Sequence, residues 1–292
     1  MVTSGGLSKA WDNRRYNPAE VWAFEPIVKP DVPDGKLAYS SEIDSFVNSK
    51  IANANLEPTE IAGPAVLLRR AYYDLLGLPP SIEETDAFVS AYSKDPNGAW
   101  SELIDKLLAS PHYGERWGQH WLDVVRYADT SGFSNDFERS NAWRYRDYVI
   151  RAFNEDLPYD QFIVQQIAGD ELAKDKNSSS NSAPELTMSE GLVSTGFLRM
   201  GPWEHTAMTP EKVSRQIYLD DLTNAVGETF LSPPLKCCKC HDHKFDPIPT
   251  RDYYRIYAAF ATTQPAEMKS EFLDKESRNG FEEQKAHVQR LL

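Results

Sequence analysis

Three cysteines and a histidine gather in one short stretch near the C-terminal end of the chain. The stretch reads Cys237-Cys238-Lys239-Cys240-His241, and it holds every cysteine of the 292-residue protein. Cys237, Cys240 and His241 form the pattern C-x-x-C-H, which is the attachment signature of a c-type haem. Two thiols at this spacing can each add to one vinyl group of the same porphyrin, and the next residue can bind the iron as its proximal ligand. The pattern therefore predicts covalent haem c.

Other chemistry is open to the same side chains. Thiolate and imidazole are ligands that zinc prefers, so a compact zinc site is an alternative, with Cys237, Cys240, His241 and His243 as its ligands. A redox dithiol or a simple disulfide between two of the cysteines is another. Three buried apolar cysteines would be a purely structural explanation, which fits poorly with the polar and charged residues interleaved with them.

A six-coordinate haem iron needs a second His or Met on its distal face. Residues 200–208 form a predicted loop that carries one histidine and two methionines, and we expect His205 to be this ligand. His243 is disfavoured for the distal role, because only one residue separates it from His241 and residues this close do not readily reach opposite faces of one porphyrin. The weaker distal candidates are His120 and Met200. If no protein ligand fills the position, the same site becomes an open haem oxidoreductase centre, with His205 in an acid–base role.

Charged residues around these candidates have two possible roles each. Arg144 and Arg146 could hold the haem propionates, because guanidinium groups match carboxylates bidentately; internal ion pairs, for instance with Asp123, Asp129 or Asp136, are the alternative. The carboxylates of Asp242 and Asp246 could bind a hard cation. We favour the role of orienting His241 for one of them, because an axial histidine needs its other ring nitrogen satisfied.

Composition restricts the class of protein. The formal net charge is −13 and the calculated pI is about 5.0, which argues against nucleic acid as a partner and is compatible with docking to a basic redox partner. Hydrophobic residues make up 41% and aromatic residues 12%, as in a globular protein. No apolar run has the length of a membrane span, and residues 1–10 do not read as a secretory signal. Because haem c is attached outside the cytoplasm, we expect an extracytoplasmic protein, periplasmic or at the cell surface, whose export signal lies outside this sequence.

The elements that must position these residues are helices. Apolar residues recur at helical spacing and no segment alternates as a strand does, so the predicted fold class is all-α: an irregular multi-helix domain with long loops and a C-x-x-C-H haem-attachment loop. Ser41, Ser81 and Thr250 are the predicted caps. The predicted helices span residues 41–54, 65–76, 82–92, 100–108, 113–127, 141–153, 159–167, 186–198, 210–230 and 251–261. We expect an N-terminal extension over 1–21, a cytochrome-c-like helical domain over 22–262, and a C-terminal linker with the start of a helix over 263–292. Residues 174–184 read as a polar surface loop.

Motifs along most of the chain carry a resemblance to a known family. In order they are Leu68-Arg69-Arg70, residues 74–80 (DLLGLPP), 110–117 (SPHYGERW), 120–123 (HWLD), 143–147 (WRYRD), 158–162 (PYDQF), 166–170 (QIAGD), 240–248 (CHDHKFDPI) and 252–254 (DYY). From about Trp22 to about Phe260 the chain resembles the second planctomycete-specific cytochrome-like domain, a domain of unknown function. The resemblance implies a c-type haem domain within a larger exported protein, with a redox partner protein or neighbouring domains of the same polypeptide as partners. It implies no particular substrate. A metal- or disulfide-stapled domain that binds a partner or a polysaccharide is the non-haem alternative.

Overall fold

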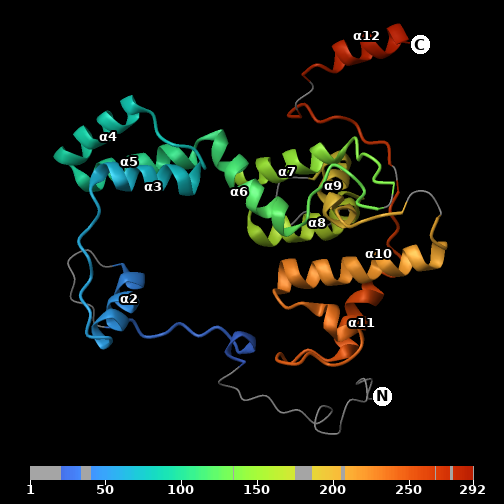
Figure 1. Ribbon diagram of the computed structural model, residues 1–292, viewed down its shortest axis with the longest axis horizontal. Helices are drawn as coiled ribbons and strands as arrows, with labels where there is room; N and C mark the ends of the chain where they lie inside the picture. The colour runs from blue at the N-terminus through green and yellow to red at the C-terminus, as the bar shows by residue number, and fades with distance from the viewer. Residues whose placement is uncertain are drawn as a thin grey trace.

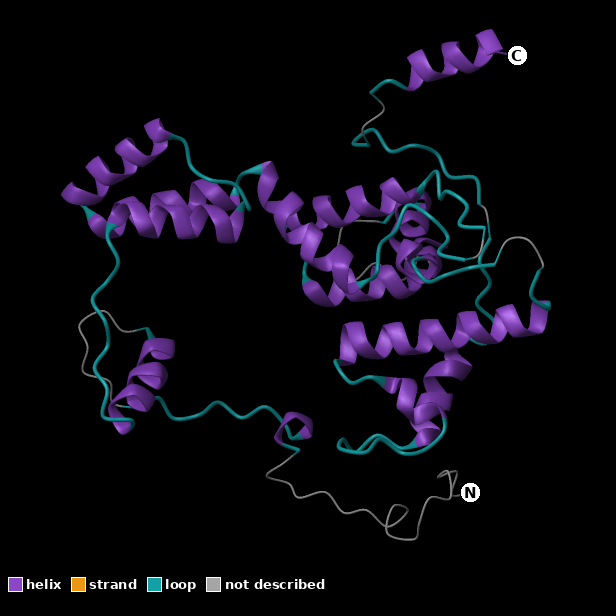
Figure 2. Ribbon diagram, viewed as in Figure 1, coloured by secondary structure: helices purple, strands orange, loops and turns teal. Residues whose placement is uncertain are grey.

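The computed structural model describes residues 21–33, 41–133, 135–174, 186–204, 208–266, 268–276 and 279–291. These residues form helices joined by long loops (Figures 1 and 2). They contain no β-strand; Thr130 and Glu138 form an isolated bridge. The all-α class predicted from helical periodicity is therefore confirmed for this part of the chain.

The helices follow one another along the chain, with loops of varied length between them. The α-helices are α2 (Glu42–Asn53), α3 (Pro64–Leu75), α4 (Ile82–Lys94), α5 (Pro96–Leu108), α6 (Pro111–Val124), α7 (Ala142–Asn154), α8 (Tyr159–Lys174), α9 (Met188–Ser194), α10 (Glu211–Val226), α11 (Thr250–Ala259) and α12 (Phe281–Leu291). Shorter helical elements are η2 (Trp22–Phe24), η3 (Thr195–Arg199), η4 (Gly227–Leu231) and η5 (Leu235–Lys239). Ala168 has non-helical backbone angles, so α8 is two helices joined at a kink just after the predicted end at residue 167.

Capping residues explain where the N-terminal helices begin. Ser41 and Ser81 both cap their helices, as predicted, and the structure shows a capping box at each, so each helix start satisfies two backbone donors reciprocally. Helix α5 begins earlier than the predicted residue 100, because the Asp95 side chain accepts from the backbone N–H of Gly98 at 3.0 Å and Pro96 opens the first turn.

Helix α2 leaves part of its apolar face exposed. Its apolar residues recur at helical spacing, yet Ile43 is 73% exposed and Val47 is 49% exposed. Ser45 is the buried residue of this helix. Periodicity predicted the helix correctly, but it does not supply a packing partner for the apolar face.

Helices α3, α4 and α5 pack together around an apolar cluster of their own, which we call the α3–α5 core (Figure 1). Its buried residues are Leu68, Ala71, Tyr72, Phe88, Ala99, Leu103 and Leu107. Gly77 ends α3 in the left-handed region, with φ of 70°, where glycine carries no steric penalty.

A larger apolar cluster, the central core, joins α7 to α10 and the segments beside them. Its buried residues are Val125, Tyr145, Tyr148, Val149, Ala152, Phe162, Val193, Phe197, Met200, Tyr218, Leu219, Leu222, Ala225, Val226 and Phe260. Helix α6 packs closely on α7, because Gly114 lets its backbone approach: a Cβ there would lie 2.4 Å from the carbonyl oxygen of Ile150.

Several expectations concern parts of the chain that lie outside the described ranges. These are the N-terminal extension up to residue 20 and the polar loop from residue 175 onward. The domain limits proposed from the sequence stay predictions. Among the described residues, no helix combines the length and the apolar character needed to cross a membrane.

Candidate functional site

The C-x-x-C-H segment forms a tight turn at the surface of the protein. Helix η5 contains Cys237 and Cys238, and the backbone N–H of Cys240 donates to the carbonyl oxygen of Cys237 at 3.4 Å, which closes the turn. Cys237 and Cys240 are both exposed free thiols, whereas Cys238 is fully buried. The turn therefore separates the three cysteines into two accessible thiols and one sequestered thiol.

Cys238 belongs to a small apolar cluster beneath the turn, the loop core. Its members are Leu235, Cys238, Ile248 and Tyr253. The Cys238 Sγ atom lies 3.7 Å from the carbonyl oxygen of Ile248, within hydrogen-bonding range for sulfur. Burial raises the pKa of this thiol to about 11, and the neighbouring Cys237 adds to the shift. Cys238 is consequently a structural residue, since a reactive cysteine needs a thiolate and access to solvent.

His241 follows the turn with one ring nitrogen already engaged. Its Nδ1 atom lies 2.7 Å from the backbone carbonyl oxygen of Asp242. A carbonyl oxygen only accepts hydrogen bonds, so Nδ1 carries a proton and donates. We expected a carboxylate of Asp242 or Asp246 to orient this ring; instead the backbone of Asp242 does so.

The Asp242 carboxylate has a different task. It accepts from the backbone N–H of Thr250 at 2.8 Å, at the start of helix α11. A carboxylate there satisfies an unpaired helical donor and is stabilised by the positive end of the helix. Thr250 itself was the predicted cap, but it is the first residue of α11 and the cap comes from Asp242 across the loop.

His243 points back into its own loop and is largely buried. Its Nδ1 atom lies 3.0 Å from the backbone nitrogen of Asp246 and 2.9 Å from a carboxylate oxygen of the same residue. In the ranges that the structure describes, no three His, Cys, Asp or Glu side chains are grouped in a way that could hold a metal ion. The four residues of the zinc alternative are thus not brought together as a ligand set.

Helices α10 and α11 hold the turn from both sides. Asp220 accepts from the Lys239 ammonium group and, at 2.6 Å, from the Tyr253 hydroxyl. The Tyr254 hydroxyl donates to the Lys239 carbonyl oxygen at 3.1 Å, and the backbone N–H of Lys236 donates to the Asn224 side chain at 2.8 Å.

The contacts with Asp220 raise the pKa values of both of its partners. Hydrogen bonding to Asp220 raises the pKa of Lys239, and burial followed by the same carboxylate raises the pKa of Tyr253. The sequence did not reveal this role of Asp220, because 19 residues separate it from Lys239 and no local pattern joins them.

Arg144 does not face the C-x-x-C-H turn. Its guanidinium group is buried and pairs with both carboxylate oxygens of Glu276, at 2.7 and 3.0 Å, and donates to the carbonyl oxygen of Glu271 at 2.8 Å. The propionate role proposed for Arg144 is therefore replaced by the internal ion pair, though none of the three suggested aspartates is its partner. Arg146 is partly exposed and pairs with its neighbour Asp147 at 2.8 Å.

The distal-ligand candidates are scattered. His205 lies outside the described residues. Met200 is buried in the central core, and not in the loop core that contains Cys238. His120 lines a cavity together with Trp121, but Cys237, Cys240 and His241 are not among the residues lining it.

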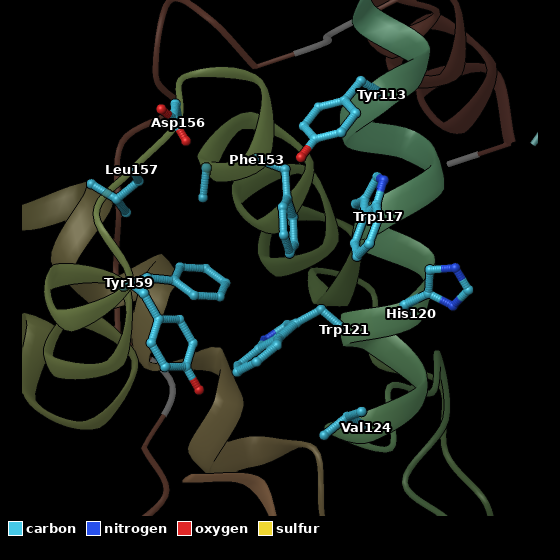
Figure 3. Close-up of a pocket in the computed structure, with 11 residues that line it drawn as sticks. Tyr113, Trp117, His120, Trp121, Val124, Phe153, Asp156, Leu157 and Tyr159 are labelled. Atoms are coloured by element: carbon cyan, nitrogen blue, oxygen red, sulfur yellow. The ribbon is translucent and has the colours of Figure 1, made fainter. Parts of the chain in front are cut away.

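That cavity has a volume of about 390 Å³ and lies between α6, the end of α7 and the start of α8 (Figure 3). We call it the aromatic cavity. Its lining residues are Tyr113, Trp117, His120, Trp121, Val124, Ala152, Phe153, Asp156, Leu157, Tyr159 and Phe162. Three aromatic residues of α6, Tyr113, Trp117 and Trp121, form one wall of this open space.

Comparison with known proteins agrees with the sequence motifs. A family model, PSCyt2, described as a protein of unknown function (DUF1549), matches residues 42–265. No curated protein and no solved structure matches the chain.

Proposed function

The chain belongs to the PSCyt2 family of planctomycete-specific cytochrome-like proteins, and on that premise we propose that it is a c-type haem-binding redox domain. Cys237 and Cys240 are the proposed attachment thiols and His241 is the proposed proximal ligand. One observation carries the proposal: two exposed thiols flank a sequestered third on one turn, directly before a histidine whose Nδ1 is already engaged.

The exposure pattern fits the C-x-x-C-H spacing. Thioether formation requires both attachment thiols to reach the vinyl groups of one porphyrin, and the accessible pair is the pair that the motif requires. Cys238 is a poor attachment thiol, because it is buried and burial raises its pKa, which lowers its thiolate fraction.

The tautomer of His241 supports the ligand role. Donation from Nδ1 to the Asp242 carbonyl oxygen leaves the lone pair of the neutral ring on Nε2. Metal-bound histidines are commonly oriented in this way, by donating their second ring nitrogen to a carbonyl or carboxylate group. A haem bound here would supply reversible one-electron chemistry.

The surface beside the turn offers apolar contacts for a flat macrocycle. Phe245 is exposed two residues after His243, and Tyr254, which donates to Lys239, is also exposed. A porphyrin that covers such rings would remove apolar surface from water, which favours binding.

His205 remains our proposed distal ligand, with Met200 and His120 as weaker candidates. The burial of Met200 in the central core argues against it, because its sulfur would have to leave that core to reach the iron. If no protein ligand fills the position, the domain is a haem oxidoreductase, with His205 as a distal acid–base group.

We further propose that the domain works outside the cytoplasm as part of a larger exported protein. Its electron partner would be a redox protein or a neighbouring domain of the same polypeptide. The net charge of −13 favours a partner with a basic docking face.

An absorption spectrum tests the proposal. The protein should be made in a bacterial host that carries the haem-maturation machinery, and then extracted with acidified acetone. Covalent haem keeps its Soret band with the protein, whereas non-covalent haem leaves with the solvent. Colourless protein from cells that mature a control cytochrome c would overturn the proposal.

The same preparation also distinguishes the haem proposal from the non-haem alternative. A disulfide or a dithiol formed by Cys237 and Cys240 is compatible with their exposure, and would make the chain a stapled domain for binding a partner or a polysaccharide. In that case a thiol assay would find the pair oxidised, or metal analysis would find stoichiometric zinc, in protein that lacks haem.

A further inference from the structure

The aromatic cavity has the walls of a ligand site. Three helices contribute rings: Tyr113, Trp117 and Trp121 come from α6, Phe153 from α7, and Tyr159 and Phe162 from α8. Figure 3 shows Trp117 and Phe153 on opposite sides of the space, with Trp121 and Tyr159 below them, while the His120 ring turns outward. A volume of about 390 Å³ falls within the range of small-molecule pockets.

The walls are held in place before any ligand arrives. The Trp121 indole N–H donates to the Gln166 side chain at 2.9 Å, and its ring contacts Phe162 at a centroid distance of 4.9 Å. Between α6 and α7, the backbone N–H of Gly114 donates to the Asn154 side chain at 2.8 Å. Rings that are fixed in this way lose little freedom on binding, which favours affinity.

The charge in this cavity is negative. Asp156 is the one carboxylate among the lining residues, and none of them is lysine or arginine. Its side chain has no hydrogen-bond or ion-pair partner in the described parts of the chain. The carboxylate is therefore available to a ligand at the edge of the aromatic walls.

The backbone around Asp156 adds to this negative potential. The N–H of Leu157 donates to the Ala152 carbonyl oxygen at 2.9 Å and the N–H of Asp156 donates to the Phe153 carbonyl oxygen at 3.3 Å, which together form a Schellman motif at the end of α7. The C-terminal end of a helix carries a partial negative charge and attracts cations. Asp156 has φ of 50°, the position in this motif that glycine normally occupies. A side chain there costs backbone energy that glycine would not.

We propose that the aromatic cavity binds an organic cation with an apolar, methylated ammonium head. Aromatic faces attract such a cation through their quadrupoles, and quaternary ammonium groups are the ligands that aromatic cages typically take. The Asp156 carboxylate and the end of α7 supply the charge complement at one side of the cage. The site is separate from the C-x-x-C-H turn, so the proposal does not depend on haem.

Choline and its neutral carbon isostere, in which a tert-butyl group replaces the trimethylammonium head, provide a matched pair of probes. Titration calorimetry on the full chain should show choline binding about tenfold more tightly than the isostere. The two probes have the same shape, so this factor is the one expected from the cation–π interaction of choline alone. Equal affinities, or tighter binding of a neutral sugar such as cellobiose, would overturn the proposal.

Asp156→Asn isolates the charge. Asparagine tolerates the left-handed backbone, so the fold is retained, and helical circular dichroism can verify this. Choline affinity should fall roughly fivefold, while the affinity for the isostere stays the same. Asp123→Asn removes the same charge from the exposed surface of α6, outside the cavity, and should leave both affinities unchanged. Equal losses in the two variants would show a general charge effect and overturn the assignment to Asp156.

Discussion

The Nδ1 atom of His241 donates a hydrogen bond of 2.7 Å to the backbone carbonyl oxygen of Asp242, while the carboxylate of the same aspartate caps helix α11. Asp242 thus orients His241 through its backbone and anchors the loop through its side chain. Mutation can separate these two roles, since a substitution of Asp242 removes the carboxylate and keeps the backbone carbonyl group.

Asp242→Ala should therefore weaken the fold without changing the tautomer of His241. Loss of the cap on Thr250 is expected to lower the free energy of unfolding by about 1 kcal/mol. Urea denaturation measures this loss. Asp242→Asn, which can still accept from the Thr250 N–H, should lose less; an alanine variant as stable as the wild type would show that the cap is not used.

The Arg144–Glu276 pair should be a strong determinant of stability, because it links α7 to a segment 132 residues away and the Glu276 side chain is fully buried. Glu276→Gln leaves the guanidinium group without its charge partner, at an expected cost of about 3–5 kcal/mol. Replacing both residues by methionine should recover most of that loss.

The control for this measurement is Glu282→Gln, whose side chain is almost fully exposed in α12 and pairs with Lys285 at 4.0 Å. It should change the free energy of unfolding in urea by less than about 0.5 kcal/mol. A similar small change for Glu276→Gln would mean that the buried pair contributes nothing net.

Acid should destabilise the α3–α5 core through Glu84. Hydrogen bonds from the Tyr72 hydroxyl, the Ser81 backbone and the Lys106 ammonium group lower the pKa of this carboxyl from 4.5 to about 2. Since the folded-state pKa lies below the unfolded one, the stabilisation is complete above pH 4.5 and is lost as the pH falls towards 2.

Thermal unfolding followed by circular dichroism across this pH window checks the prediction. Glu84→Gln keeps the capping box but cannot titrate, so its melting temperature should depend less on pH than that of the wild type. Glu102→Gln, on the exposed surface of α5, should behave as the wild type does. An unaltered acid response in the Glu84 variant would refute the assignment.

Local patterns predicted much of the helical framework and little of its long-range pairing. Ser41 and Ser81 were recognisable as caps because their partners lie three residues away. The sequence did not identify Glu276 as the ion-pair partner of Arg144, or Asp220 as the partner of Lys239. Those contacts form only when segments that are distant in the sequence pack together.

The same limit applies to the candidate site. The spacing of Cys237, Cys240 and His241 identified a chemical motif, but only the structure shows that the intervening Cys238 is buried. Asp156 was missed because its position depends on the end of α7, where a cap that usually selects glycine holds an aspartate. Its one local signal was its position just before Leu157-Pro158, at the end of a helical pattern.

If the proposed haem is six-coordinate, His205→Ala should change its spin state. Loss of the distal imidazole would convert a low-spin absorption spectrum to a high-spin one and let carbon monoxide bind the reduced protein. His112→Ala is a suitable control, because His112 is exposed and pairs with Glu115 at 2.7 Å. An unchanged low-spin spectrum in the His205 variant would transfer the assignment to His120 or Met200.

The intact mass of the protein, after maturation in a haem-loading host and denaturation in acid, tests the central claim most directly. We predict that the wild type gains the mass of one haem and that Cys238→Ala keeps it, since the buried thiol takes no part in attachment. Cys237→Ala and Cys240→Ala should each lose acid-stable haem. Haem mass retained on the double variant of Cys237 and Cys240, or none on the wild type, would contradict the account.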